Sequence, residues 1–185
     1  MFLSIKNIPK VKWSSKKPLN FKPKFSTFVY LCLGLGIFGL GEGLLIVSYT
    51  GASPWSVLAQ GISLNVGFSI GVVTFFVSIF ALSLWTFLDQ KPGIGTILNI
   101  IIIAVMIDLS IAFFETPQNF IGQLVMAIVA VLLVGLGSGI YLIANLGPGP
   151  RDGLMTGLQK KTNLPIAVVR GFLEITVVSI GWYLG

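Results

Sequence analysis

Five long apolar segments decide what this chain can fold into. A helix needs about 20 mostly apolar residues to cross the hydrocarbon core of a bilayer. Five stretches meet that length almost without charge, at about 27–47, 69–88, 94–114, 120–144 and 165–184. A bilayer offers no water to satisfy backbone polar groups, so spanning segments of this kind are helical. The sequence therefore predicts an all-α integral membrane protein with five transmembrane helices.

The basic charge is concentrated at the start of the chain. Only 10% of the 185 residues are charged, whereas a soluble domain has about 25%. The first 24 residues hold seven of the twelve basic side chains: Lys6, Lys10, Lys12, Lys16, Lys17, Lys22 and Lys24. A nucleic-acid reader carries its basic groups on a folded face, so we expect no nucleic-acid partner. We expect a Lys-rich tail over 1–26 and one membrane domain over 27–185.

Loop charge also predicts the orientation in the membrane. Cytoplasmic loops are enriched in Lys and Arg, so the tail places the N-terminus in the cytoplasm. Five spans then place the connections at 89–92 and 147–164 inside and the C-terminus outside. The predicted outer connections, 48–68 and 115–119, carry no Lys or Arg. The tail is interpreted as this topology signal, and anchoring to anionic lipid is the alternative.

Two residue types needed for common active sites are scarce. The chain has no His and a single Cys, Cys32. A His-ligated metal, a His-based catalytic triad, an internal disulfide and a Cys-rich metal site are therefore excluded. We expect no enzyme activity, no cofactor and no bound metal. A reaction that uses only carboxylates and Arg is the weakest of the functional hypotheses.

The chain contains an internal repeat. Residues 39–85 align without a gap to residues 135–181, an offset of 135 − 39 = 96, with 14 identities in 47 pairs. Each unit reads as a span, a Gly/Pro turn, a short segment and a second span. The units cover about 27–88 and 120–185, and the span at 94–114 lies between them. Because the first and fourth spans run in opposite directions, the two units form an inverted repeat. Such repeats are common in secondary transporters, and a duplication retained only for packing is the alternative.

Each unit also contains a short segment that cannot cross the bilayer. Ser53 can cap a helix that begins at Pro54, extends to about Leu64 and ends at Gly67. The equivalent helix begins at Pro150 and extends to about residue 161. Twelve residues reach about 18 Å, whereas the hydrocarbon core is about 30 Å thick. Each short helix therefore either lies at the membrane surface or enters the membrane as a re-entrant half-helix.

Charges within the spans and residues at the two turns are the candidate site. Ionisable groups at membrane depth are costly and usually mark a function or a partner. Arg170 and Glu174 lie four apart on one helix face, which predicts an ion pair. An Arg beside free helix N–H groups, such as Arg151, forms an anion site. The alternatives are that Arg151 pairs with Asp152 or Glu174, or that it only follows the positive-inside rule. The candidate substrate-binding residues are Glu42, Gly51, Ser53, Pro54, Trp55, Asp108, Gly147, Pro148, Gly149, Pro150, Arg151, Asp152, Arg170 and Glu174.

Two pairs of glycines spaced by four residues predict a helix contact. Gly39 and Gly43 belong to the first span, and Gly135 and Gly139 belong to the fourth. Small residues at this spacing let two membrane helices approach closely. We therefore expect the first and fourth spans to meet at these glycines.

Several motifs of the chain resemble those of a known family. They are 39–42, 51–55, 92–96, the Arg170-to-Glu174 pair and the stretch 147–157, which begins with the run Gly-Pro-Gly-Pro-Arg-Asp-Gly. With these motifs the chain resembles the YczE/YitT-type family of bacterial multi-pass membrane proteins, over about 27–185. The resemblance implies a bacterial inner (plasma) membrane protein that is often suspected of transport. It implies no agreed substrate and no catalytic residues.

Two functional hypotheses follow. The first is a small-solute secondary transporter or channel whose site lies between the two Gly/Pro turns, with a small anionic or zwitterionic solute. A five-span chain is small for a transporter, which makes a homodimer plausible. The second is an accessory or scaffold protein that acts through a protein partner and transports nothing.

Overall fold

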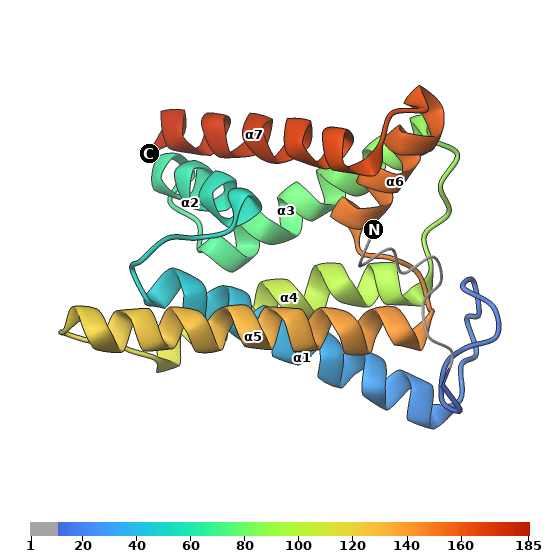
Figure 1. Cartoon of the computed structure of the whole chain (residues 1–185), viewed down its shortest axis with the longest axis horizontal. Helices are drawn as coiled ribbons and strands as arrows, with labels where there is room; N and C mark the ends of the chain where they lie inside the picture. Colours follow the sequence, from blue (N-terminus) through green and yellow to red (C-terminus); the bar gives the residue numbers. More distant parts are fainter. Residues whose placement is uncertain (1–10) are drawn as a thin grey trace.

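The computed structural model describes residues 11–185, so Lys6 and Lys10 of the predicted tail lie outside the described residues. All regular secondary structure in the described chain is helical (Figure 1). The helices are α1 (Phe25–Val47), α2 (Pro54–Val66), α3 (Ile70–Ser83), a 3₁₀ helix η1 (Leu84–Phe87), α4 (Ile94–Phe113), α5 (Phe120–Ala144), α6 (Pro150–Thr162) and α7 (Ile166–Leu184). Five of them are long and apolar enough to cross a membrane: α1, α3 with η1, α4, α5 and α7. The predicted all-α, five-span membrane fold is confirmed.

The first short helix begins and ends with the capping chemistry predicted for it, and the second has a similar start and end. Ser53 accepts a hydrogen bond from the backbone N–H of Ser56, and Pro54 is the first residue of α2. Gly67 ends α2 with a φ of 73°, in the left-handed region where Gly costs least. α6 likewise begins at a Pro and ends at Asn163 with a φ of 56°. Both ends of α2 and α6 are therefore set by local sequence.

The helices form two groups that lie one above the other in Figure 1. α1, α4 and α5 pack together in the lower group, and α2, α3, α6 and α7 form the upper group. The lower core is built around buried aliphatic side chains such as Leu31, Leu35 and Ile107. The upper core is built around Trp55, Trp85 and apolar neighbours. Contact between α3 and α4 joins the two groups.

The predicted contact between the two glycine pairs is wrong. Gly39 and Gly43 of α1 lie against α4, where added Cβ atoms would stand 2.7 Å from Met106 Cβ and 2.7 Å from Ser110 Oγ. Added Cβ atoms at Gly135 and Gly139 would meet no described atom within 4 Å. The spacing of small residues identifies a helix face suited to close packing, but it does not identify the helix that packs there.

The first and fourth spans, α1 and α5, do meet as predicted, but through Gly41 and Gly137. A Cβ added to Gly41 would lie 2.8 Å from the carbonyl oxygen of Ala130, and one added to Gly137 would lie 2.7 Å from that of Gly34. These two contacts are reciprocal, because 137 − 41 = 96 and 130 − 34 = 96. At this crossing the two helices therefore use equivalent positions, 34 and 41 of α1 and 130 and 137 of α5.

A second reciprocal contact joins the short helices to the long helices of the opposite unit. α2 packs on α7, where Gly181 leaves room for the backbone of Val57. α6 packs on α3 and η1, where Gly153 leaves room for the indole ring of Trp85 of η1. At the offset of 96, Val57 is equivalent to Gly153 and Trp85 is equivalent to Gly181. In the first contact the short helix provides the larger residue, and in the second contact the short helix provides the glycine. An inverted repeat predicts such exchanged contacts; the symmetry relation itself stays a prediction.

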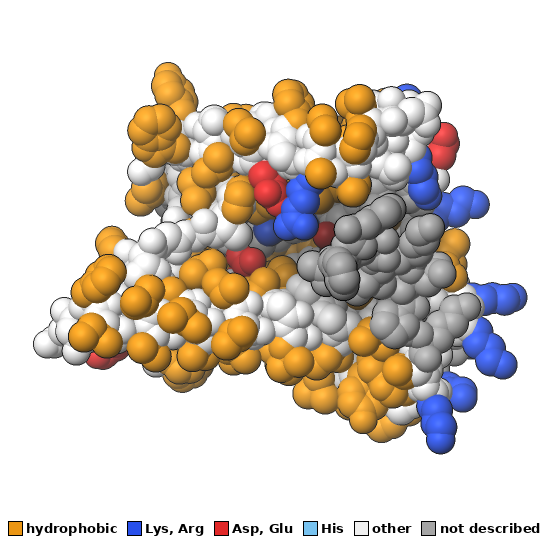
Figure 2. Space-filling model, in the orientation of Figure 1, with side chains coloured by type: hydrophobic (Ala, Val, Ile, Leu, Met, Phe, Trp, Pro, Cys, Tyr) orange, Lys and Arg blue, Asp and Glu red, His pale blue; other side chains and the backbone are white. Residues whose placement is uncertain are grey.

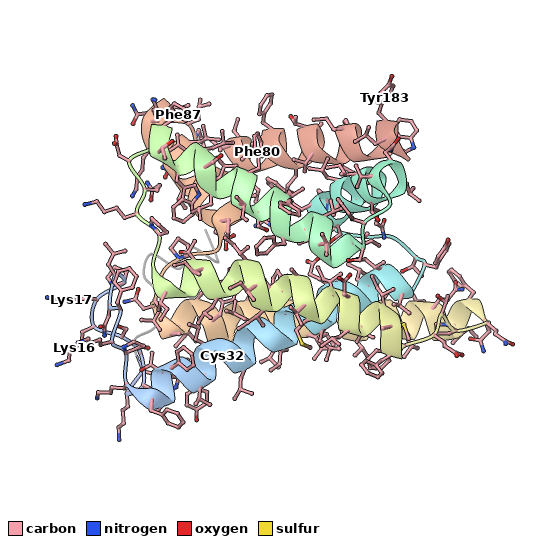
Figure 3. All side chains as sticks on the ribbon, turned by 180° about the vertical axis from the view of Figure 1, so that it is seen from behind. Lys16, Lys17, Cys32, Phe80, Phe87 and Tyr183 are labelled. Atoms are coloured by element: carbon pink, nitrogen blue, oxygen red, sulfur yellow. The ribbon has the colours of Figure 1, made fainter. Side chains whose placement is uncertain are left out.

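The described part of the Lys-rich tail packs on the end of the bundle. The backbone N–H of Ser15 donates to the carbonyl of Ala144 at 3.0 Å, and the side chain of Asn145 donates to the carbonyl of Ser15 at 2.9 Å. Lys16 and Lys17 are exposed at the end of the molecule where α1 begins (Figure 3). That this end faces the cytoplasm stays a prediction.

The α1–α5 crossing gives a direct stability test. Gly137→Ala places a methyl group against the α1 backbone, so we expect it to lower the free energy of unfolding by about 1–3 kcal/mol. Gly139→Ala, on the same helix but in open space, should change it by less than about 1 kcal/mol. Denaturation of purified protein in detergent micelles, followed by circular dichroism, measures both. Equal effects of the two variants would contradict the crossing.

Candidate functional site

One cavity collects five of the eleven charged residues of the membrane domain. It has a volume of about 380 Å³ and lies among α1, α3, α4, α5, α7 and the first turns of α2 and α6. Figure 2 shows a hollow between α7 above and α5 below, where acidic and basic side chains gather. Nine of the predicted site residues line the cavity: Glu42, Ser53, Pro54, Trp55, Gly149, Arg151, Asp152, Arg170 and Glu174. The two Gly/Pro turns therefore lead into the same space.

Glu42 is the buried carboxylate of the cavity. Its side chain is 5% exposed. The hydroxyls of Ser53 and Ser56 donate hydrogen bonds to its Oε2 at 2.8 and 2.7 Å. These donors come from the first turn of α2, so they attach that turn to α1. Among the described residues no group donates to Oε1, which leaves one carboxylate oxygen available to a ligand.

Arg151 lies at the start of α6 and stacks on Trp55. Its guanidinium carbon is 5.1 Å from the centre of the indole ring, within the range of a cation–π interaction. Within residues 11–185 no carboxylate lies within ion-pair distance of Arg151, and no acceptor takes a hydrogen bond from it. The predicted alternative, an ion pair with Asp152 or Glu174, is therefore wrong. The five N–H donors of Arg151 remain available for an anionic group.

Arg151 and Trp55 are equivalent residues of the two units, because 151 − 55 = 96. Equivalent residues can touch only where the two units meet. Their stacking therefore places the cavity at the junction of the two units.

The other acidic groups of the cavity have partners. The phenol of Tyr141, on α5, donates a short hydrogen bond to Oδ2 of Asp152. Arg170 Nε lies 2.7 Å from Glu174 Oε1, so the predicted i,i+4 ion pair is confirmed. This pair is not enclosed, since the side chains of Arg170 and Glu174 are 65% and 30% exposed.

Asp108 is a predicted site residue that lies away from the cavity. Its carboxylate accepts hydrogen bonds from the Ser69 hydroxyl at 2.6 Å and from the Gly71 backbone N–H at 2.7 Å. It therefore caps the first turn of α3. The sequence marked Asp108 because it lies in an apolar span, but its position near the end of α4 places it beside a helix start.

Four turn residues also lie outside the cavity lining, and most of them support α6. The carbonyl of Pro148 accepts a hydrogen bond from Thr96 at 2.8 Å, and the carbonyl of Pro150 accepts one from the Trp85 indole at 2.9 Å. Gly147 packs on the start of α4 with a φ of 111°. Gly51, with a φ of 147°, lines a separate surface pocket. The turns thus position the first turn of α6, and Gly149, Arg151 and Asp152 reach the cavity.

Several polar residues of the cavity were missed from the sequence. They are Ser78, Asn99, Ser138 and Tyr141. The repeat offers a signal for two of them, since Ser138 is equivalent to Glu42 and Ser78 is equivalent to Glu174 at the offset of 96. Nothing in the sequence points to Asn99 or Tyr141, which belong to apolar spans and reach the cavity through the packing of those spans.

Comparison with known proteins identifies the family. Residues 25–185 match the model of a family described as a family of unknown function, DUF6198. The chain belongs to this family. The match covers the whole membrane domain and excludes most of the Lys-rich tail.

Two bacterial relatives extend this result. An uncharacterized protein of Haemophilus influenzae is 36% identical over 181 residues, which are 98% of this chain and 82% of that protein. The uncharacterized membrane protein YczE of Bacillus subtilis is 27% identical over 162 residues, 87% of this chain and 73% of that protein. The resemblance to a YczE-type family is confirmed. No solved structure matches this chain.

The Glu42 hydrogen bonds can be tested by removing one donor. Ser56 is 1% exposed, so Ser56→Ala should lower the free energy of unfolding by about 1–3 kcal/mol. In a Glu42→Ala background the same change should have a much smaller effect, because its acceptor is gone. A double-mutant cycle in detergent micelles measures this coupling. Additive effects of the two substitutions would contradict the assigned bond.

Proposed function

We propose that this membrane protein is a small-solute secondary transporter or channel, with its binding site in the cavity between the two Gly/Pro turns. The observation that carries the proposal is the cavity itself, which brings Glu42, Arg151, Asp152, Arg170 and Glu174 together. Charged groups at membrane depth are costly, and they usually line a solute pathway or meet a partner. A cavity of about 380 Å³ is within the range of small-molecule sites.

The position of the cavity supports transport over simple packing. Inverted-repeat transporters bind solute where their units meet, beside the ends of broken helices. Here the first turns of α2 and α6 both line the cavity. Two helices lying flat on opposite membrane surfaces would not share a cavity. We therefore propose that α2 and α6 are re-entrant half-helices of an inverted repeat.

The charges of the site favour an anionic or zwitterionic solute. The proposed anchor for a carboxylate or similar anion is Arg151, which has no ion-pair partner among the described residues. Its planar fork can hold two oxygens of such a group. The free oxygen of Glu42 could hold an ammonium group of the same solute. The proposal assigns the site no catalytic step.

The open ion pair on α7 favours a second candidate function. The side chain of Arg170 is 65% exposed, although α7 is long and apolar enough to span the membrane. Exposed charges on such a helix are expected where another protein covers them. An accessory or scaffold protein acting through a membrane partner is therefore the alternative to a solute carrier.

Uptake of labelled glycine and labelled lactate into proteoliposomes tests the first proposal. We expect saturable uptake of at least one of the two solutes. Uptake of glycine alone would indicate that the site requires a zwitterion. Arg151→Ala removes charge-assisted hydrogen bonds of about 1.5–3 kcal/mol each, which corresponds to an affinity loss of about tenfold or more. Arg151→Lys keeps the charge without the fork and should retain part of the affinity. Gly36→Ala, in open space on α1, is the matched control.

Two results would contradict this proposal. Equal uptake by the parent protein and both Arg151 variants would remove Arg151 from the site. Uptake of neither solute above that of protein-free liposomes would favour the accessory function.

A further inference from the structure

A second hollow of the molecule shares the short helix α2 with the polar cavity. It has a volume of about 570 Å³ and lies among α2, α3 and α7. Apart from Thr176, every side chain that lines it is apolar. We call this hollow the apolar groove. Figure 3 shows the molecule from behind, with α7 above α3 and with Phe80, a lining residue on α3, labelled.

α2 contributes different residues to the two spaces. Its start lines the polar cavity through Ser53 and Pro54. Further along, Leu58, Ile62 and Val66 line the apolar groove. These three residues are spaced by four, so they form one stripe on the helix, and 66 − 58 = 8 residues extend it over about 12 Å. The groove therefore begins beside the polar cavity and follows α2 away from it.

Trp55 stands between the two spaces. Among the described residues it alone lines both the polar cavity and the apolar groove. Its ring stacks on Arg151 of the cavity. It also belongs to the buried apolar cluster that contains Ala81 and Val177, which line the groove. A ligand that occupied both spaces would therefore pass directly beside this indole ring.

The indole N–H of Trp55 is a buried donor without a partner. Trp55 is 8% exposed, and its Nε1 has no acceptor among the described residues. The indole of Trp85, by contrast, donates to the carbonyl of Pro150 at 2.9 Å. A buried donor without an acceptor is unfavourable. The Trp55 ring is thus held without a hydrogen bond, and an anionic ligand group beside Arg151 would supply the missing acceptor.

We propose that the polar cavity and the apolar groove together bind a single-chain amphiphilic anion, of the chemistry of a medium-chain carboxylate. The carboxylate binds Arg151, which has no ion-pair partner among the described residues, and accepts from the Trp55 N–H. The apolar chain lies in the groove along α2, where no charged side chain meets it. This inference rests on the proposed function, because it uses the same cavity and names the class of its solute.

A bilayer phospholipid fits this pair of spaces less well. Its headgroup stays at the membrane surface, where water hydrates the phosphate. The polar cavity is lined by Glu174, which is at the middle of α7, eight residues after Ile166 and ten before Leu184. An anionic group held beside Arg151 therefore lies deeper than a phospholipid headgroup.

A further helix is too wide for the groove. α2 packs on both α3 and α7. Packed helices have axes about 8–10 Å apart, so the axes of α3 and α7 are at most about 20 Å apart beside α2. Subtracting one helix diameter of about 10–12 Å leaves about 8–10 Å between their surfaces. That width accepts an extended hydrocarbon chain more readily than a helix with its side chains.

Photolabelling of the full chain in phosphatidylcholine liposomes tests the proposal. The probe is laurate with a diazirine at the end of its chain, and mass spectrometry of peptides locates the adducts. We expect adducts mainly on residues that line the groove, such as Ile62, Phe80 and Ile180. Excess unlabelled laurate should lower their yield several-fold. Dodecanol, which has the same chain without the charge, should lower it much less.

One pair of variants tests the binding of the carboxylate. Arg151→Ala removes the proposed anion anchor and should lower the groove adduct about tenfold at a subsaturating probe concentration. Arg151→Lys keeps the charge and should retain part of the yield. Lys160→Ala removes an exposed charge from the same helix, outside the lining of the cavity, and should leave the yield unchanged.

A second pair of variants tests the position of the chain. Thr176→Phe adds a ring to the groove lining and should lower the groove adduct several-fold. Ile175→Phe adds a ring at the neighbouring residue, which is 67% exposed and outside that lining, and should leave the yield unchanged. Circular dichroism of each purified variant checks that its helical structure is retained.

Three results would overturn the proposal. They are equal groove labelling of the parent protein and Arg151→Ala, equal labelling of Thr176→Phe and Ile175→Phe, and stronger groove labelling by a phosphatidylglycerol that carries the same diazirine chain. The last result would assign the groove to a bilayer lipid.

This experiment measures binding, so its outcome is separate from that of the transport proposal. Uptake of glycine or lactate without groove labelling that depends on Arg151 would contradict this inference alone. Groove labelling that depends on Arg151, without uptake of either solute, would support this inference and contradict transport of those solutes.

Discussion

The close crossing of α1 and α5 is the constraint on which the rest of the structure depends. With no side chains at Gly41 and Gly137, the two longest helices approach to backbone contact. Residues next to the crossing, Glu42 and Ser138, then face the same cavity. Dispersion forces and close packing hold such a crossing in lipid, because apolar burial offers no advantage between helices there. A larger side chain at either glycine would separate the helices that form the cavity floor.

The hydrogen bonds of Glu42 connect this crossing to the upper group of helices. A buried carboxylate in a membrane needs donors, and α2 provides two hydroxyls in its first turn. On the opposite side, Tyr141 of α5 provides the donor for Asp152 at the start of α6. Each short helix is therefore held at its first turn by a bond between a carboxylate and a hydroxyl. In each case the carboxylate and its hydroxyl donors come from different helices, so the cavity and the positions of α2 and α6 are determined together.

Features that depend on neighbouring residues could be predicted from the sequence. Span positions, the Ser53 and Gly67 caps and the Arg170–Glu174 pair each involve residues a few positions apart, and the structure contains them. Features that depend on which residues of distant helices meet could not. The first and fourth spans meet as predicted, but not at the predicted glycine pairs, and Asp108 caps a helix start 37 residues away. Local sequence specifies a helix and its ends, whereas the pairing of helices depends on the shapes of all of them at once.

The stacking of Arg151 on Trp55 has a consequence for any exchange between two forms of the protein. If the two units exchanged their conformations, Trp55 would take the position that Arg151 has now, and Arg151 would take that of Trp55, since the two residues are equivalent. A cation and an indole ring have different hydration energies, so the original and exchanged forms would differ in free energy. The protein would then rest with its cavity open toward one preferred side, and the Trp55–Arg151 difference would help to determine which side that is.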